Sequence, residues 1–169
     1  MKIPDLAELE KEASSEGFLL RIQVRRPLNI WAIRVVIAEK TEPNKLRIWG
    51  EMKGWAYRGV KGLQLDTMQV NRMAPPGIGH IVWAATMTWA LEATPCKCAR
   101  LLAIYDSKNQ NDRLVKYFNR RKFKLIKEVG SSPLDLPLRL IWGGASSLMS
   151  ADCSEVLMYS YLLWQKARF

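Results

Sequence analysis

Residues 63–93 read LQLDTMQVN (63–71), RMAPPGIGH (72–80) and IVWAATMTWALEA (81–93), and this stretch decides the fold. The first segment has the apolar and β-branched residues of a strand, and the second is a Pro/Gly loop. The third contains no helix breaker and is apolar nearly all round, which is typical of a buried helix. The stretch therefore predicts a strand, a glycine-containing loop and a buried helix, in that order.

Gly77 and Gly79 stand between this predicted strand and helix. A glycine pair there lets the backbone approach a ligand closely, while free N–H groups and the helix dipole attract an anion. The loop lacks the Lys-Ser/Thr ending of a P-loop and the third glycine of a dinucleotide fingerprint. Two interpretations stay open: a phosphate cradle, or a tight turn that only lets the buried helix start.

The segments on either side of this stretch extend the pattern. Before it, we expect a short acidic helix over 3–16 and strands over 18–25, 31–39 and 45–57. After it, we expect a strand over 100–105, a helix from 109 to about 121, strands over 123–129 and 134–142, and a last, apolar helix over 154–166. No repeat or linker divides the chain, so residues 1–169 predict a single α/β (α+β) domain with its core over 18–142.

Composition limits the classes of function. The chain has 169 residues, 49% of them hydrophobic, and 26 Lys and Arg against 16 Asp and Glu give a net charge of +10. Such a charge favours an acidic partner: nucleic acid, an anionic membrane surface or a polyphosphate ligand such as coenzyme A. No apolar run is long enough to span a bilayer, and few cysteines suit a reducing compartment. We therefore expect a cytoplasmic protein.

A second segment, NDRLVKYFNRRKF (111–123), carries a resemblance to a known family. Asn111 is followed by apolar Leu114, aromatic Phe118 and finally Phe123, at intervals that resemble the sequence closing the acyl-coenzyme A site in the GNAT superfamily of N-acetyltransferases. The order strand, Gly-x-Gly, helix, strand, helix, strand over 46–142 also resembles the core of that fold. The resemblance implies a GNAT-like twisted mixed sheet flanked by helices.

The chain departs from the family pattern at several places. Ala74 stands where GNAT loops have Gln or Arg, although Arg72 lies nearby. Phe118 aligns with the Tyr that often serves as general acid, and only its neighbour Tyr117 carries a hydroxyl. The two helices that usually follow the first strand and shape the acceptor pocket are missing, because only residues 26–30 separate the first two predicted strands.

The resemblance implies acyl transfer from acetyl-coenzyme A, or another acyl-coenzyme A, directly to an amine. The base would be a strand carboxylate, and the acid could be Tyr105 or Tyr117. Glu51 and Asp66 are the candidate bases, and either could equally be an exposed carboxylate paired with a cation. The implied coenzyme A-binding residues are Arg72, Gly77, Ile78, Gly79, His80, Asn111 and Phe118.

An alternative function is a non-catalytic GNAT-like protein that binds a macromolecular partner. It would use the basic residues around the helix that ends near 121 and the aromatic C-terminal helix. Arg113, Lys116 and Arg120 share a helical face, and Arg121 belongs to the same basic cluster. Nucleic-acid or anionic-membrane binding rests on charge alone.

We predict no metal site. A zinc set would have to be drawn from three cysteines and one histidine that lack the paired spacing of zinc ligands: Cys96, Cys98, Cys153 and His80.

Overall fold

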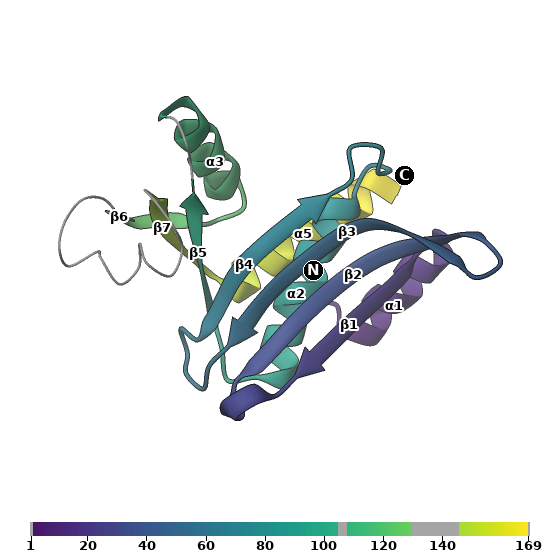
Figure 1. Ribbon diagram of the computed structural model, residues 1–169, viewed down its shortest axis with the longest axis horizontal. Helices are drawn as coiled ribbons and strands as arrows, with labels where there is room; N and C mark the ends of the chain where they lie inside the picture. Colours follow the sequence, from purple (N-terminus) through teal and green to yellow (C-terminus); the bar gives the residue numbers. More distant parts are fainter. Residues whose placement is uncertain (1, 105–107, 130–145, 169) are drawn as a thin grey trace.

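The described residues contain seven strands, which form one mixed sheet in the order β1-β2-β3-β4-β5-β7-β6 (Figure 1). The computed structural model describes the backbone of residues 2–104, 108–129 and 146–168, and the side chains of 2–103, 112–126 and 147–168. The elements are α1 (Leu6–Ser15), β1 (Leu19–Arg25), η1 (Pro27–Asn29), β2 (Trp31–Glu42), β3 (Lys45–Ala56), β4 (Leu63–Val70), α2 (Ile78–Ala93), β5 (Cys98–Ile104), α3 (Lys108–Arg120), β6 (Lys124–Val129), β7 (Ser146–Asp152) and α5 (Cys153–Arg168).

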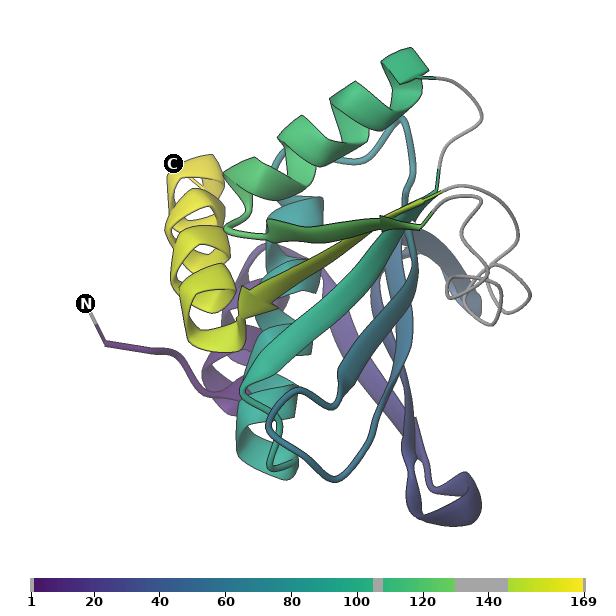
Figure 2. The same ribbon diagram turned by 90° about the vertical axis from the view of Figure 1, so that its left-hand side faces the viewer.

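Helix α2 is the centre of the hydrophobic core. It packs between the sheet and α5, and Figure 2 shows both helices on the same side of the strands. Its large side chains are buried on every side, as the apolar sequence predicts. Gly50 on β3 lets the helix come close, since a Cβ there would lie 3.0 Å from the Ile78 side chain and 3.2 Å from that of Val82.

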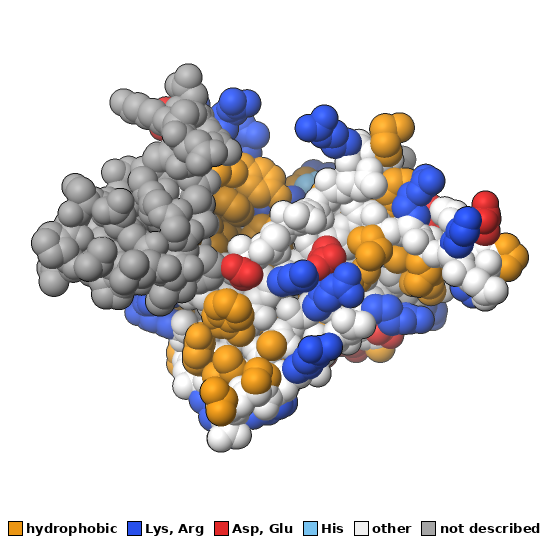
Figure 3. All heavy atoms as spheres, viewed as in Figure 1, with side chains coloured by type: hydrophobic (Ala, Val, Ile, Leu, Met, Phe, Trp, Pro, Cys, Tyr) orange, Lys and Arg blue, Asp and Glu red, His pale blue; other side chains and the backbone are white. Residues whose placement is uncertain are grey.

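The opposite face of β1–β4 is open, with no described helix over it. Directly paired residues of antiparallel strands share a face, so the register places Gln23, Arg34, Lys53 and Thr67 in one row across this surface. Figure 3 views this face and shows Lys and Arg side chains spread over it, with Asp and Glu among them. We call it the open face.

Strands β4 and β5 are the parallel pair of the sheet, and they separate early. Only three residue pairs join them: Leu63 with Ala99, Gln64 with Arg100, and Leu65 with Leu101. Beyond these pairs the two strands diverge, and α3 lies near the wide end of the opening (Figure 1). The sheet therefore opens between β4 and β5.

A β-bulge in β4 lies at the start of this opening. Lys53 of β3 pairs with Thr67, but the next residue, Gly54, pairs with Leu65, so Asp66 is the extra residue. Gly54 is required here, because a Cβ would lie 2.5 Å from the carbonyl oxygen of Gln64. The bulge leaves Asp66 without a paired residue on β3, while Thr67 stays in the ladder.

Two of the sequence expectations are wrong. Helix α2 starts at Ile78 rather than Ile81, so Gly79 and His80 belong to its first turn. Residues 146–152 form strand β7, where the sequence pattern predicted neither a strand nor a helix. Its small polar residues are held by pairing with β5 on one side and β6 on the other, so the sheet extends beyond residue 142. The strand expected over 134–142 lies outside the described residues.

No helix of the described chain has both the length and the apolar character needed to cross a membrane.

Candidate functional site

A small cavity, about 50 Å³ in volume, lies where β4 and β5 separate. Its walls come from β3, β4, β5, α2 and α3. The lining residues are Met52, Leu65, Asp66, Thr67, Met68, Trp83, Leu101, Leu102 and Phe118. The cavity is mostly apolar, and Asp66 brings a carboxylate to it.

Asp66 also faces the open side of the sheet. It lines a groove of about 330 Å³ that crosses the open face toward β1. The Thr67 hydroxyl donates a hydrogen bond to Asp66 Oδ2 over 3.2 Å, and the Asp66 side chain is otherwise exposed. Asp66 therefore stands between the cavity and the open-face groove.

Glu51, the second candidate base, is held in ion pairs on the open face. Arg34 donates from Nε to Oε1 and from Nη2 to Oε2, both at 3.1 Å, and Lys53 Nζ lies 3.2 Å from Oε1. These hydrogen bonds, from Arg34 first and then from Lys53, hold the pKa of Glu51 below its usual range. A carboxylate stabilised in this way is a weak base.

The first turn of α2 presents backbone amides at the wide end of the opening. Gly77 is the N-cap in the left-handed conformation (φ 92°), and Ile81 N–H donates to its carbonyl over 3.1 Å. The amides of Ile78, Gly79 and His80 precede that first intrahelical bond, so the helix itself gives them no acceptor. These N–H groups and the helix dipole suit an anion.

The two glycines of this turn have different roles. A Cβ on Gly77 would lie 2.8 Å from Ala167 and 3.1 Å from the Trp164 ring, so α5 and the positive φ require glycine there. A Cβ on Gly79 would lie 3.7 Å from both Met68 and Val70, which is ordinary contact. The packing around Gly79 therefore does not itself demand a glycine.

Arg121, just after α3, connects α2, α3 and α5. Its side chain is 5% exposed, and it donates from Nε to the Tyr117 hydroxyl (3.0 Å), from Nη1 to the Ser160 hydroxyl (3.1 Å) and from Nη2 to His80 Nδ1 (2.8 Å). Trp83 Nε1 also donates to the Tyr117 oxygen over 3.2 Å. We call these five residues the Arg121 cluster. Within the described side chains, no Asp or Glu pairs with the buried guanidinium.

The cluster fixes the state of His80. Because arginine has only donors, His80 Nδ1 must accept, and the ring proton sits on Nε2. Burial, and after it the charge of Arg121, lowers the pKa of His80 to about 4. His80 is therefore a neutral imidazole at neutral pH, with an Nε2–H donor beside the first turn of α2.

The structure brings several of the predicted site residues together. Asp66 and Phe118 line one cavity, and His80 and Tyr117 share Arg121 as a partner. Arg72 is exposed and lines a separate groove of about 840 Å³ with Glu51. Tyr105 and the side chain of Asn111 lie outside the residues that the structure describes.

Sequence reasoning missed the Arg121 cluster as a unit. Arg121 was expected on a basic surface, and it is buried instead. Its spacing of four residues from Tyr117 was a weak signal, but Trp83 and Ser160 come from distant segments and gave none.

Metal-ligating side chains do not gather in groups of three or more anywhere in residues 2–103, 112–126 and 147–168.

Comparison with known proteins supports the fold. No model of a known protein family matches the chain, and no curated protein matches it in sequence. A solved structure, that of a nourseothricin acetyltransferase, superposes with a TM-score of 0.51 and 13% sequence identity, over 81% of this chain and 88% of that chain. The protein therefore has a GNAT-like fold: a single α/β domain whose mixed seven-stranded sheet opens between β4 and β5.

Proposed function

We propose that the protein is an acyl-coenzyme A-dependent N-acyltransferase that uses the opening between β4 and β5. The observation that carries the proposal is the end of the β4–β5 ladder after three residue pairs, next to the amides that begin α2. An elongated thioester needs a slot for its acyl arm and a positive site for its phosphates, and this arrangement supplies both.

The pyrophosphate would bind at the first turn of α2. The amides of Ile78, Gly79 and His80 supply donors, and Gly79 leaves the backbone uncovered. The Nε2–H of His80 is a further donor, held in that state by Arg121. The acyl arm would lie between the diverging strands, with Phe118 along one wall, and Asn111 and Arg72 would contact the rest of the coenzyme.

The reaction would join an amine to the acyl group. Asp66 would take the proton of the acceptor ammonium group, because it is exposed at the bulge, whereas Glu51 is engaged by Arg34 and Lys53. The amine nitrogen then attacks the thioester carbonyl and the new C–N bond forms. The nitrogen releases its second proton to solvent, and the C–S bond breaks with its electron pair on sulfur. The products are an amide and coenzyme A.

Tyr117 would return a proton to the leaving sulfur. Its oxygen accepts hydrogen bonds from Trp83 and Arg121, so its own proton is left for another partner.

Binding of acetyl-coenzyme A tests the proposal. A ligand at a hundred times its dissociation constant stabilises the native state by about 2.7 kcal/mol, which a thermal scan detects. Gly79→Val should weaken binding without changing the far-UV spectrum, because its branches cover the amides. Gly59→Val is the matched control, since no atom lies within 4 Å of a Cβ there. No stabilisation at millimolar ligand would overturn the proposal.

A binding function remains a second candidate because α3 keeps a basic face. Arg113, Lys116 and Arg120 are all exposed. The aromatic C-terminal helix favours this candidate less, since α5 buries Val156, Leu157 and Trp164 against the core. Binding of a nucleic acid to this face would weaken steeply with salt and would be lost when all three cations are exchanged for Gln.

The proposal places the protein in the cytoplasm. Cys96, Cys98 and Cys153 are all free thiols, as a reducing compartment would keep them.

A further inference from the structure

The open-face groove adjoins the candidate base. The residues that line this groove come from four neighbouring strands. They are Gln23 and Arg25 of β1; Ala32, Ile33 and Arg34 of β2; Lys53, Gly54 and Trp55 of β3; and Asp66 of β4. Only the short η1 turn connects β1 to β2, so no described helix covers this end of the sheet. The groove is the surface from which a second substrate could reach Asp66.

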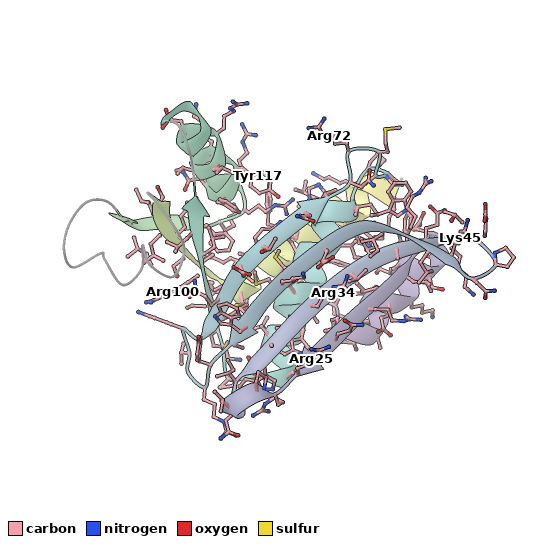
Figure 4. All side chains as sticks on the ribbon, viewed as in Figure 1. Arg25, Arg34, Lys45, Arg72, Arg100 and Tyr117 are labelled. Carbon is pink, nitrogen blue, oxygen red and sulfur yellow. The ribbon has the colours of Figure 1, made fainter. Side chains whose placement is uncertain are left out.

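Its charges are divided between two ends. Asp66 is the acidic lining residue, at the β4 end. Arg34 and Lys53, in the middle, share Glu51 as a partner. Arg25, at the β1 end, is exposed, and no described side chain pairs with it. Figure 4 shows Arg25 and Arg34 on the same open face.

The spacing of the two ends follows from the sheet. Arg25 pairs with Ala32, Ala32 with Trp55, and Trp55 with Gln64 of β4, so three strand spacings separate the two edges of the groove. At about 4.8 Å for each spacing, the backbones lie roughly 14 Å apart. An extended Arg25 side chain and the shorter Asp66 side chain cover part of that span. A compact molecule a few atoms long would bridge the remainder.

We propose that the acceptor is an amine that also carries an anionic group, a carboxylate or a phosphate. Its ammonium group lies at Asp66, and its anionic group lies at Arg25, with Arg34 and Lys53 along the groove between them. This inference rests on the proposed function. The groove's excess of cations disfavours polyamines, because a second ammonium group would meet Arg25 rather than a carboxylate.

Titration of the protein without acyl-coenzyme A tests the inference. The probes are O-phosphoethanolamine and 4-aminobutyrate, with ethanolamine and butylamine as matched amines that lack the anion. We expect the anionic amines to shift the Trp55 indole and Ala32 amide resonances, and to bind at least about tenfold more tightly than their neutral counterparts. The stronger of the two anionic probes identifies phosphate or carboxylate as the preferred group.

Variants locate the two ends of the bound probe. Arg25→Gln should weaken the anionic probes about tenfold and leave the neutral amines unchanged, whereas Arg25→Lys should retain most of the binding. Asp66→Asn should weaken all four amines. Arg47→Gln, on β3 outside the groove and stacked on Trp49, removes the same charge elsewhere and should leave binding as in the wild type.

Several outcomes would overturn the inference: equal binding of anionic and neutral amines, no binding of any probe, or equal effects of Arg25→Gln and Arg47→Gln. Failure of the proposed function is measured separately, as failure to bind acetyl-coenzyme A. If anionic amines bind through Arg25 but acetyl-coenzyme A does not bind, the groove is still an amine-binding site, and the acyltransferase proposal is refuted.

Discussion

Arg121 Nη2 donates a hydrogen bond to His80 Nδ1 over 2.8 Å, joining the end of α3 to the first turn of α2 across 41 residues of sequence. Arginine stays charged at every accessible pH, so a proton on Nδ1 would break this bond and place two cations together. The contact therefore keeps the imidazole neutral and ties together two walls of the β4–β5 opening.

The first prediction concerns the ionisation of His80. Burial and Arg121 lower its pKa to about 4, and it is the single histidine of the chain. Its ring resonances in an NMR titration should therefore move with a midpoint near 4. Arg121→Leu should raise that midpoint while burial still holds it below 6.5. A wild-type midpoint above 6 would show that the contact does not exist in solution.

The second prediction concerns stability against pH. The pKa of His80 is lower in the folded chain than in the unfolded chain, so the unfolded state binds the proton first as the pH falls. The contribution of neutral His80 to the free energy of unfolding is complete above about pH 6.5 and declines toward pH 4. After allowance for solvent near the half-buried ring, the loss is on the order of 1–2 kcal/mol.

Urea unfolding at several pH values measures this decline. His80→Gln is the control, because its side-chain oxygen can still accept from Arg121 but does not titrate. The variant should lose less stability than the wild type between pH 6.5 and pH 4. Parallel curves for the two proteins would refute the assignment.

The third prediction tests the bulge in β4. A Cβ at residue 54 would lie 2.5 Å from the Gln64 carbonyl oxygen, so Gly54→Ala must push the two strands apart. The cost should be about 2 kcal/mol or more in free energy of unfolding. Gly59→Ala, where a Cβ meets nothing within 4 Å, should change stability little. Equal melting temperatures for the two variants would mean that β4 does not approach Gly54 as described.

The fourth prediction concerns the attachment of α5 to α1 through Glu12. One carboxylate oxygen accepts from the Tyr161 hydroxyl (2.6 Å), and the other accepts from Trp164 Nε1 (2.9 Å) and Gln165 Nε2 (2.7 Å), with Arg168 Nη1 at 3.1 Å. Glu12→Ala leaves the buried indole N–H without a partner and should cost about 3 kcal/mol.

Chemical denaturation of Glu12→Ala beside Glu10→Ala tests this attachment. Glu10 is exposed on the same helix, and the structure gives its carboxylate no partner among the described residues. Its variant should unfold close to the wild type, and a comparable loss in both variants would point to a general charge effect instead.

The sequence predicted most elements because their periodicity is local. The meander β1–β4 and the buried α2 were predicted with ends within a few residues of those observed. The start of α2 was placed late because glycine usually marks a break, whereas Gly79 sits in the first turn, where its backbone conformation is helical. Strand β7 was missed because Ser146, Ser147 and Ser150 have no strand preference of their own.

The candidate site was less predictable because tertiary contacts determine it. From the sequence, Glu51 and Asp66 were equivalent candidate bases. Only the fold pairs Glu51 with Arg34 and places Asp66 at a β-bulge. The burial of Arg121 depends on three elements that meet only in the folded chain. The local sequence pattern contains no information on contacts between segments that are distant in the chain.

The short β4–β5 ladder also has a mechanical consequence. With three paired residues between them, β1–β4 and β5–β7 are two half-sheets on a narrow seam, and α5 packs against both α2 and β7. Among the described residues, the amides beyond Leu65 and Leu101 have no cross-strand partner at the seam. Solvent exchange should therefore be fastest there and slowest in β2, β3 and α2. A ligand that fills the seam would join the two half-sheets. Its binding should therefore slow amide exchange in β4 and in β5 together.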